Sequence, residues 1–233
     1  MLTHDRFPAL LGPRSRNSRI PAWIAVAAVL VAPPVLLAAV YDAYPPNGLS
    51  QILTLQPGDT LILHAGTYNR VYTGSMTTNG TAAGWITIKG ADNEPRPLID
   101  YTGGNNIFDL ANKCYFKFQN LEIQKGSDTF KFTGTCHDII LENIYMHDAF
   151  DGCVNASGIV ELYNLTVRGC EIARIASTST GEAFYLGGHE KIYQPQVHDS
   201  LIEQNYIHDV NEGVEIKAGC TNIIVRDNVI SAN

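Results

Sequence analysis

The chain has 233 residues, of which 45% are hydrophobic and 17% are charged. This composition excludes a disordered polyelectrolyte and supplies enough apolar material for a core. The net charge of −7 argues against a nucleic-acid partner, and it would repel an acidic polymer unless a cation lies between the two.

Residues 1–39 have the pattern of a secretory signal peptide. Four arginines, Arg6, Arg14, Arg16 and Arg19, precede an apolar run that ends in small residues near Ala39. We predict cleavage after Ala39 and a secreted, extracellular protein. If it is not cleaved, the run is long enough for a signal anchor, which would be the only contact with a membrane. Residues 40–52 are predicted to be a linker.

Short strand-like pieces follow from residue 53. The stretches "LQPGDTLILHAGTYNR" and "GWITIKGADNEPRPLID" both read as strand, turn, strand.

The second half contains a repeat. Five segments align without gaps, "FQNLEIQK", "LENIYMHD", "VRGCEIAR", "IEQNYIHD" and "VRDNVISA". Their first residues are Phe118, Leu141, Val167, Ile202 and Val225. Their sixth residues are Ile123, Met146, Ile172, Ile207 and Ile230. Both columns are apolar, and a polar residue, usually Asn, fills the third or fourth position. The unit is about 23 residues with one insertion.

Each unit has a further short apolar piece between these segments, namely "TFKFTG", "GCVNAS", "AFYLGG" or "GVEIKAG". Strands of this length, separated by Gly and Asn bends, exclude helical solenoids. The sequence therefore predicts an all-β fold, a single-stranded right-handed parallel β-helix over residues 53–233, whose strands lie about 4.8 Å apart. The repeat stops abruptly, so we expect the β-helix to be truncated at the C-terminus.

"PGDTLILHAGTY" and "WITIKG…PLID" resemble the opening rungs of pectate-lyase-like β-helix proteins, which include the alginate lyase and chondroitinase B group. "GEAFYLGG" and "NEGVEIKAGCTNIIVRDN" resemble later rungs of the same superfamily. The resemblance covers about residues 53–233 and implies the fold more than the activity, because the superfamily contains lyases, hydrolases, epimerases and non-enzymes. It also implies that a substrate lies along the sheet formed by the four short apolar pieces.

The apolar residues of these four strands predict how the strands align with one another. The predicted inward residues are Phe130, Cys153, Phe184 and Val214, with Phe132, Asn155, Leu186 and Ile216 two positions later. Tyr185, Glu215 and Lys217 then share the outer face. Lys217 matches the lysine of the lyase rungs that it resembles, and we assign it as a catalytic base with Glu215 beside it. The alternative is an exposed lysine paired with Glu215 or Glu190.

Acidic residues precede each of these strands. Asp151, Glu182 and Glu212, together with Asp209, are the predicted ligands of a Ca²⁺ ion, which prefers oxygen atoms. The alternative is that Asp128, Asp151, Glu182 and Glu212 are solvated turn residues without an ion. His147-Asp148 and His208-Asp209 occupy equivalent columns of the repeat, so we interpret them mainly as part of a structural charge ladder.

The insertion "GGHEKIYQPQ" leaves the same sheet. Its residues His189, Lys191 and Tyr193, with Tyr185, are the predicted substrate-binding residues. The alternative is an ordinary loop that covers apolar surface. We also predict a Cys114–Cys136 disulfide, because the two cysteines lie almost in register on adjacent rungs.

These features predict a monomeric, secreted, carbohydrate-active protein whose partner is a polysaccharide. A lyase that cleaves a uronate-containing chain by β-elimination is the first hypothesis. A glycoside hydrolase that uses Glu182 and Glu215 about 6.5–9.5 Å apart and a non-catalytic binding or structural module are the alternatives.

Overall fold

The computed structural model describes residues 37–158, 160–175, 181–188 and 196–231. These residues form a right-handed parallel β-helix of about six turns, with rungs of about 26 residues. The predicted fold class is therefore confirmed. The segment 1–36, which holds most of the predicted signal peptide, lies outside the described residues. Within the described part, no helix is long and apolar enough to cross a membrane.

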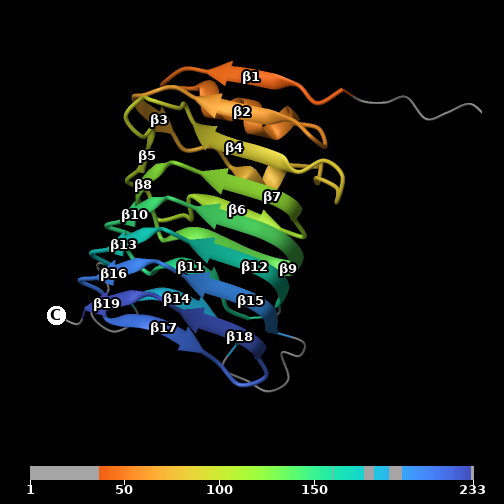
Figure 1. The fold of residues 1–233 in the computed structure, drawn as a ribbon. Helices are drawn as coiled ribbons and strands as arrows, with labels where there is room; N and C mark the ends of the chain where they lie inside the picture. The colour runs from red at the N-terminus through yellow and green to blue at the C-terminus, as the bar shows by residue number, and fades with distance from the viewer. Residues whose placement is uncertain (1–36, 159, 176–180, 189–195, 232–233) are drawn as a thin grey trace, which may run out of the picture. The chain divides into compact units, whose positions relative to one another are not determined.

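Three parallel faces surround the core (Figure 1). The first face contains β1 (Val40–Ala43), β2 (Thr60–Leu63), β4 (Ile86–Gly90), β7 (Cys114–Gln119), the second half of β9 (Asp128–Glu142), β12 (Val160–Arg168), β15 (Val197–Glu203) and β18 (Thr221–Arg226). The second face contains β3 (Thr67–Asn69), β5 (Leu98–Tyr101), β8 (Glu122–Lys125), β10 (Tyr145–His147), β13 (Glu171–Ala173), β16 (Tyr206–His208) and β19 (Val229–Ser231). The third face contains β6 (Phe108–Ala111), the first half of β9, β11 (Gly152–Ala156), β14 (Glu182–Leu186) and β17 (Glu212–Ile216).

Both predicted apolar columns are confirmed. On the first face, Phe118, Leu141, Val167, Ile202 and Val225 are direct neighbours in successive strands. On the second face, Ile123, Met146, Ile172, Ile207 and Ile230 are aligned in the same way. All except Val225 and Ile230 are fully buried, and those two lie in the last described rung. The repeat in the sequence is therefore the core of the solenoid.

The bends after the first-face strands use a left-handed backbone conformation. Residues with φ between 54° and 61° occupy one equivalent position, namely Asn120, Asn143, Gly169, Gln204 and Asp227. Asn and Gly tolerate this conformation better than most other residues. At the next position Asn205 is buried, and its Oδ1 accepts a hydrogen bond from the Cys170 amide at 2.9 Å. The polar positions of the repeat therefore turn the chain and satisfy its backbone.

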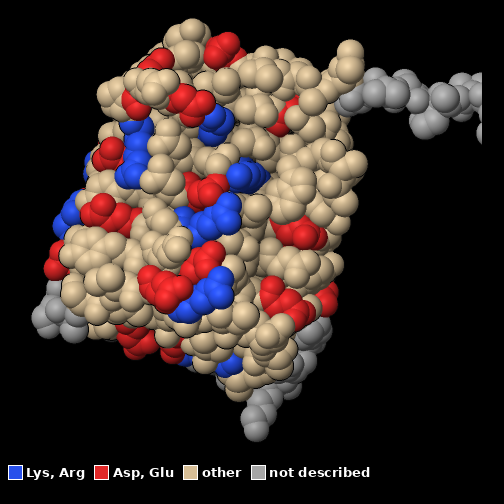
Figure 2. All heavy atoms as spheres, viewed as in Figure 1, with Lys and Arg blue, Asp and Glu red and all other residues tan. Residues whose placement is uncertain are grey.

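Charged side chains form ladders on the outside of the first face. Arg168 pairs with Glu142 at 2.7 Å, and Arg226 pairs with Glu203 at the same distance one rung apart. Figure 2 shows acidic and basic groups interspersed on the visible surface, without a large patch of either sign. Acidic and basic side chains of adjacent rungs therefore neutralise one another on this surface.

Two predictions about the chain are corrected. The segment 40–52 is part of the β-helix, because β1 pairs with β2 and the 3₁₀ helix η1 (Gly48–Thr54) buries Leu49 and Ile52. The disulfide prediction is wrong, since all five cysteines are free. Cys114 lies opposite His137 rather than Cys136, and the buried Cys136 thiol donates a hydrogen bond to the Leu110 carbonyl at 3.2 Å.

We predict that Ile202→Ala lowers the free energy of unfolding by about 2–5 kcal/mol, because it leaves a cavity in the core. Val225→Ala is the matched control in the same column. Val225 is 41% exposed, so its truncation should cost clearly less. Denaturant unfolding measures both, and equal losses would contradict the assigned ladder.

Candidate functional site

The third face has a regular inside and a chemically varied outside. Its inward column contains Phe108, Phe130, Val154, Phe184 and Val214. Its outward column contains Asp109, Lys131, Asn155, Tyr185 and Glu215. The rings of Phe108 and Phe130 stack 4.9 Å apart in the core. Aromatic packing thus holds the strands that carry the polar outer column.

The predicted register of β11 is wrong by one residue. Val154, not Cys153, aligns with Phe130 and Phe184, and Asn155 belongs to the outward column. The cause is that the consecutive residues Cys153 and Val154 are both buried in the core, so the apolar pattern alone does not set the register. Cys153 is buried there beside Thr129, which donates a hydrogen bond to its sulfur at 3.7 Å.

The acidic column is partly as predicted. Glu182 aligns with Glu212, as expected, but Gly152 and not Asp151 occupies the equivalent position in β11. Glu215 is the third member, and each pair of these three glutamates has carboxylate oxygens within 4.8 Å. Neither Asp151 nor Asp209 belongs to this group, which we call the Glu182–Glu212–Glu215 trio.

Burial and mutual repulsion perturb the trio. Glu182 is only 7% exposed. Burial, followed by the charges of Glu215, Glu212 and Asp151, raises the pKa of Glu182 to about 7. Glu215 Oε2 is buried and has no hydrogen-bond partner within the described chain. A buried carboxylate oxygen in this state is costly, so the trio is suited to receive a cation or a donor.

Lys217 lies on the outer face beside the trio, as predicted. Its ammonium donates a short hydrogen bond to Glu215 Oε1 and lies 4.8 Å from the centre of the Tyr185 ring. The hydrogen bond to Glu215 raises the pKa of Lys217. Lys217 is therefore a cation in this arrangement and can bind an acidic group. To act as a base, it must first lose its proton.

The residues present fit a Ca²⁺ ion. Carboxylate oxygens are the ligands that Ca²⁺ prefers, and Glu215 Oε2, which has no partner among the described residues, would supply one of them. Glu182 and Glu212 would supply the others on the protein side. Such an ion would neutralise the carboxylate of an acidic sugar.

A second cluster lies one to two rungs closer to the N-terminus on the same face. Lys131 Nζ donates hydrogen bonds to Asn155 Oδ1 at 2.8 Å and to Ser157 Oγ at 2.7 Å. Asn155 Nδ2 donates to Asp128 Oδ1 at 3.0 Å. Burial raises the pKa of Asp128 to about 6, although Lys131 and Asn155 oppose this shift. The cluster therefore extends the polar outward column from Tyr185 toward the N-terminal end of the third face.

The remaining predicted residues are placed as follows. His189, Lys191 and Tyr193 lie outside the described residues. Asp209 follows β16 and accepts a hydrogen bond from His208 Nδ1 at 2.9 Å. In the equivalent dipeptide, Asp148 contacts His147 at 2.6 Å and forms an ion pair with Arg174 at 2.9 Å. The two His-Asp pairs thus form local contacts within the second-face ladder, consistent with their structural interpretation.

Sequence reasoning missed the N-terminal end of this face. Asp109 heads the outward column, and Arg70 forms an ion pair with it at 3.0 Å. The alternation in "IFDLA" parallels that in "TFKFT" and could have revealed Asp109. Arg70 lies in an irregular segment after β3, where no repeat position predicts its direction.

Comparison with known proteins gives the fold. No protein-family model matches the sequence, and no curated protein matches it either. Among solved structures, pectate lyase Pel9A superposes with a TM-score of 0.61 at 14% identity, over 83% of this chain and 55% of that one. An alginate lyase from Paenibacillus sp. str. FPU-7 gives 0.58 at 15% identity, over 82% and 75%.

The GH136 lacto-N-biosidase from Eubacterium ramulus gives a TM-score of 0.55 at 19% identity, over 76% of this chain and 42% of that one. The chain thus spans between two fifths and three quarters of the length of these three structures. It has the parallel β-helix fold of pectate-lyase-like proteins.

We predict that Asp128 makes stability depend on pH between about 4 and 6. In this window the folded protein retains a proton that the unfolded chain releases, so the contribution of Asp128 to stability falls as pH rises and then levels off above about 6. A shift of two pKa units corresponds to about 3 kcal/mol.

Asp128→Asn should remove this part of the pH dependence, as measured by denaturant unfolding from pH 4 to 7, and leave the part that Glu182 contributes. The control is Asp92→Asn, whose side chain is exposed and should leave the pH profile unchanged. Parallel profiles for Asp128→Asn and the wild type would show that the Asp128 proton does not contribute.

Proposed function

We propose that the protein is a secreted polysaccharide lyase that cleaves a uronate-containing chain by β-elimination at the third face. The observation that carries the proposal is the meeting of one lysine and three glutamates on this face, with a buried Glu215 oxygen that has no hydrogen-bond partner in the described part of the chain. The similar folds of a pectate lyase and an alginate lyase support it.

The reaction requires two tasks at neighbouring atoms. The uronate carboxylate must be neutralised so that the adjacent C–H becomes more acidic, and a base must then remove that proton. The trio would hold Ca²⁺ for the first task. Lys217, as the free amine, takes the proton, while the bond to the leaving sugar oxygen breaks and a carbon–carbon double bond forms.

The surroundings of Lys217 suit these tasks. Tyr185 holds the lysine side chain against its ring at 4.8 Å, which limits the positions of the amine. Glu215 accepts its hydrogen bond and so orients the amine, which must lose its proton before it can act as the base. The apolar run at the N-terminus is consistent with export, which a protein acting on an extracellular polymer needs.

A glycoside hydrolase is the second candidate, and one observation favours it. The carboxylate oxygens of Glu182 and Glu215 lie within 4.8 Å. This is closer than the inverting spacing that we expected, and it is nearer the 5–5.5 Å of retaining enzymes. Glu182, whose pKa is about 7, could then donate a proton to the leaving oxygen. New reducing ends without an unsaturated product would select this candidate.

We predict that Lys217→Ala and Lys217→Arg both reduce kcat on polygalacturonate or alginate by about 10²–10⁴-fold, the usual contribution of a general base. Arginine keeps the positive charge but cannot give up its proton. The measurement is the ultraviolet absorbance of the unsaturated product. Lys125→Ala, on the second face, is the control and should retain activity, because Lys125 lies away from the trio and pairs with Asp100 at 2.9 Å.

An active Lys217→Arg variant would reduce the role of Lys217 to charge and remove it as the base. Binding of the polymer without any product, unchanged in Lys217→Ala, would favour the non-catalytic module.

We also predict that Ca²⁺ raises the melting temperature of the wild-type protein, because an ion that binds only the folded state stabilises it. Glu212→Gln should abolish this increase by removing one ligand of the trio. Asp209→Asn should retain it, since Asp209 is outside the trio. Thermal unfolding with Ca²⁺ or with a chelator measures the effect. An increase in melting temperature that persists in Glu212→Gln but is lost in Asp209→Asn would show that the ion binds outside the trio.

A further inference from the structure

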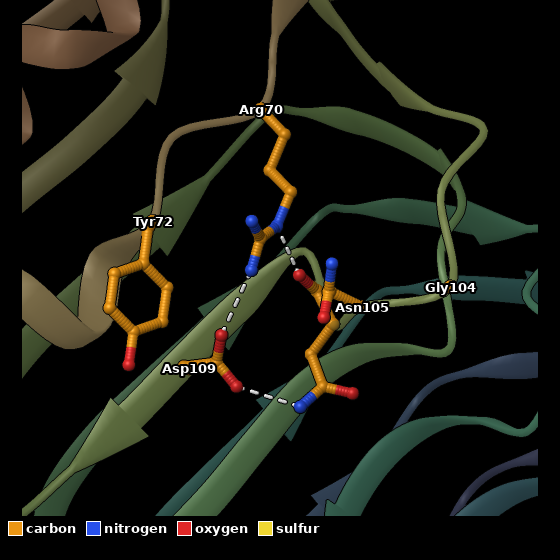
Figure 3. Close-up of a pocket in the computed structure, with 6 residues that line it drawn as sticks. Arg70, Tyr72, Gly104, Asn105 and Asp109 are labelled. Carbon is orange, nitrogen blue, oxygen red and sulfur yellow. Dashed lines mark hydrogen bonds and ion pairs between the residues drawn. The ribbon is translucent and has the colours of Figure 1, made fainter.

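A polar pocket lies at the N-terminal end of the third face (Figure 3). Its volume is about 340 Å³, and it is lined by Arg70, Tyr72, Gly104, Asn105, Asn106 and Asp109. Asp109 belongs to β6 and is the first residue of the outward column that continues through Lys131, Asn155 and Tyr185 to Glu215. The pocket and the Lys217 site are therefore the two ends of one track.

Arg70 is held rigidly in this pocket. Its Nη2 pairs with Asp109 Oδ2 at 3.0 Å, and its Nε donates a short hydrogen bond to the Asn106 carbonyl (Figure 3). The guanidinium also lies 4.9 Å from the centre of the Tyr101 ring and 5.7 Å from that of Tyr72. A binding group that is already ordered loses little entropy when a ligand arrives.

Hydrogen-bonding capacity remains on both sides of the pocket. Arg70 lines the pocket, and its Nη1 takes part in no hydrogen bond among the described residues, so this nitrogen remains available as a donor. Asn105 uses its amide nitrogen to bind the Tyr101 hydroxyl at 2.9 Å, which leaves its Oδ1 as an acceptor. The pocket thus presents a donor and an acceptor within one small space.

Charge and shape identify the ligand class. Asp109 accepts hydrogen bonds from both Arg70 and Asn106, so the charge of Arg70 is balanced. A doubly charged phosphate, which depends on a strong net positive charge, is therefore less favoured than a sugar residue that binds through its hydroxyl groups. Tyr72 is 58% exposed and offers an aromatic edge and face to an apolar surface. A sugar ring has both hydroxyl groups and an apolar C–H face, and it satisfies this combination.

We propose that this pocket is a remote subsite that binds one sugar residue of the same polysaccharide chain whose cleavage point lies at Lys217. The inference rests on the proposed function for the identity of the chain. Asp109 and Glu215 are four rung spacings apart, about 19 Å. The subsite therefore acts only on chains long enough to reach from Lys217 to Arg70, and it favours long substrates over short ones.

The test measures binding and not cleavage. Calorimetry compares a disaccharide with an octasaccharide, prepared from polygalacturonate and from alginate, in a Lys217→Ala background that prevents turnover. Tyr72→Ala and Asn105→Ala, added singly, should weaken octasaccharide binding about tenfold and leave disaccharide binding unchanged. Tyr206→Ala is the control, because Tyr206 is an exposed tyrosine on the second face and should change neither affinity.

Unchanged octasaccharide affinity in both pocket variants would overturn the subsite, and so would an equal loss for the disaccharide. If the pocket variants lose affinity for the octasaccharide only, and the wild type forms no unsaturated product, the result would support the subsite and reject the lyase. Product formation with normal binding in Tyr72→Ala and Asn105→Ala would support the lyase and reject the subsite. Failure of the wild type to bind either polymer's octasaccharide contradicts both.

Discussion

Parallel in-register stacking is the constraint on which this structure depends. Each strand pairs with the equivalent strand of the next rung, so every position of the repeat becomes a column along the solenoid. A column of apolar residues makes continuous core, as in the line from Phe118 to Ile202. A column of polar residues makes a continuous strip on the surface. A binding site is therefore expected on the surface column whose polar groups lack partners within the protein.

The three faces differ in how their charged side chains are paired. On the first and second faces, charges in adjacent rungs neutralise one another, as Arg168 does with Glu142 and Arg174 with Asp148. The third face also contains ion pairs, such as Arg70 with Asp109, but it stacks acid on acid at Glu182 and Glu212 and leaves Glu215 Oε2 without a partner in the described chain. Repulsion of this kind lowers stability unless a ligand relieves it. It is therefore a physical reason to place the site here.

Much of this arrangement could be predicted from the sequence, because regular columns repeat visibly. The core lines, the outward direction of Tyr185, Glu215 and Lys217, and the approach of Glu182 to Glu212 all follow from alternation. The register of β11 did not follow, because the adjacent apolar residues Cys153 and Val154 are both buried and the sequence does not show which of them aligns with Phe130. The Cys114–Cys136 prediction failed by a similar offset of one residue. Arg70 could not be placed, since its direction depends on tertiary contacts with Asp109 and Tyr101.

The central claim is that one polysaccharide chain lies along the third face from the trio toward Arg70. A crystal structure of Lys217→Ala with a bound octasaccharide tests it most directly. We predict electron density for sugar rings over Tyr185, Asn155 and Lys131, with an acidic group at the trio and a ring beside Tyr72. Density on the first or second face, with the third face empty, would contradict this account.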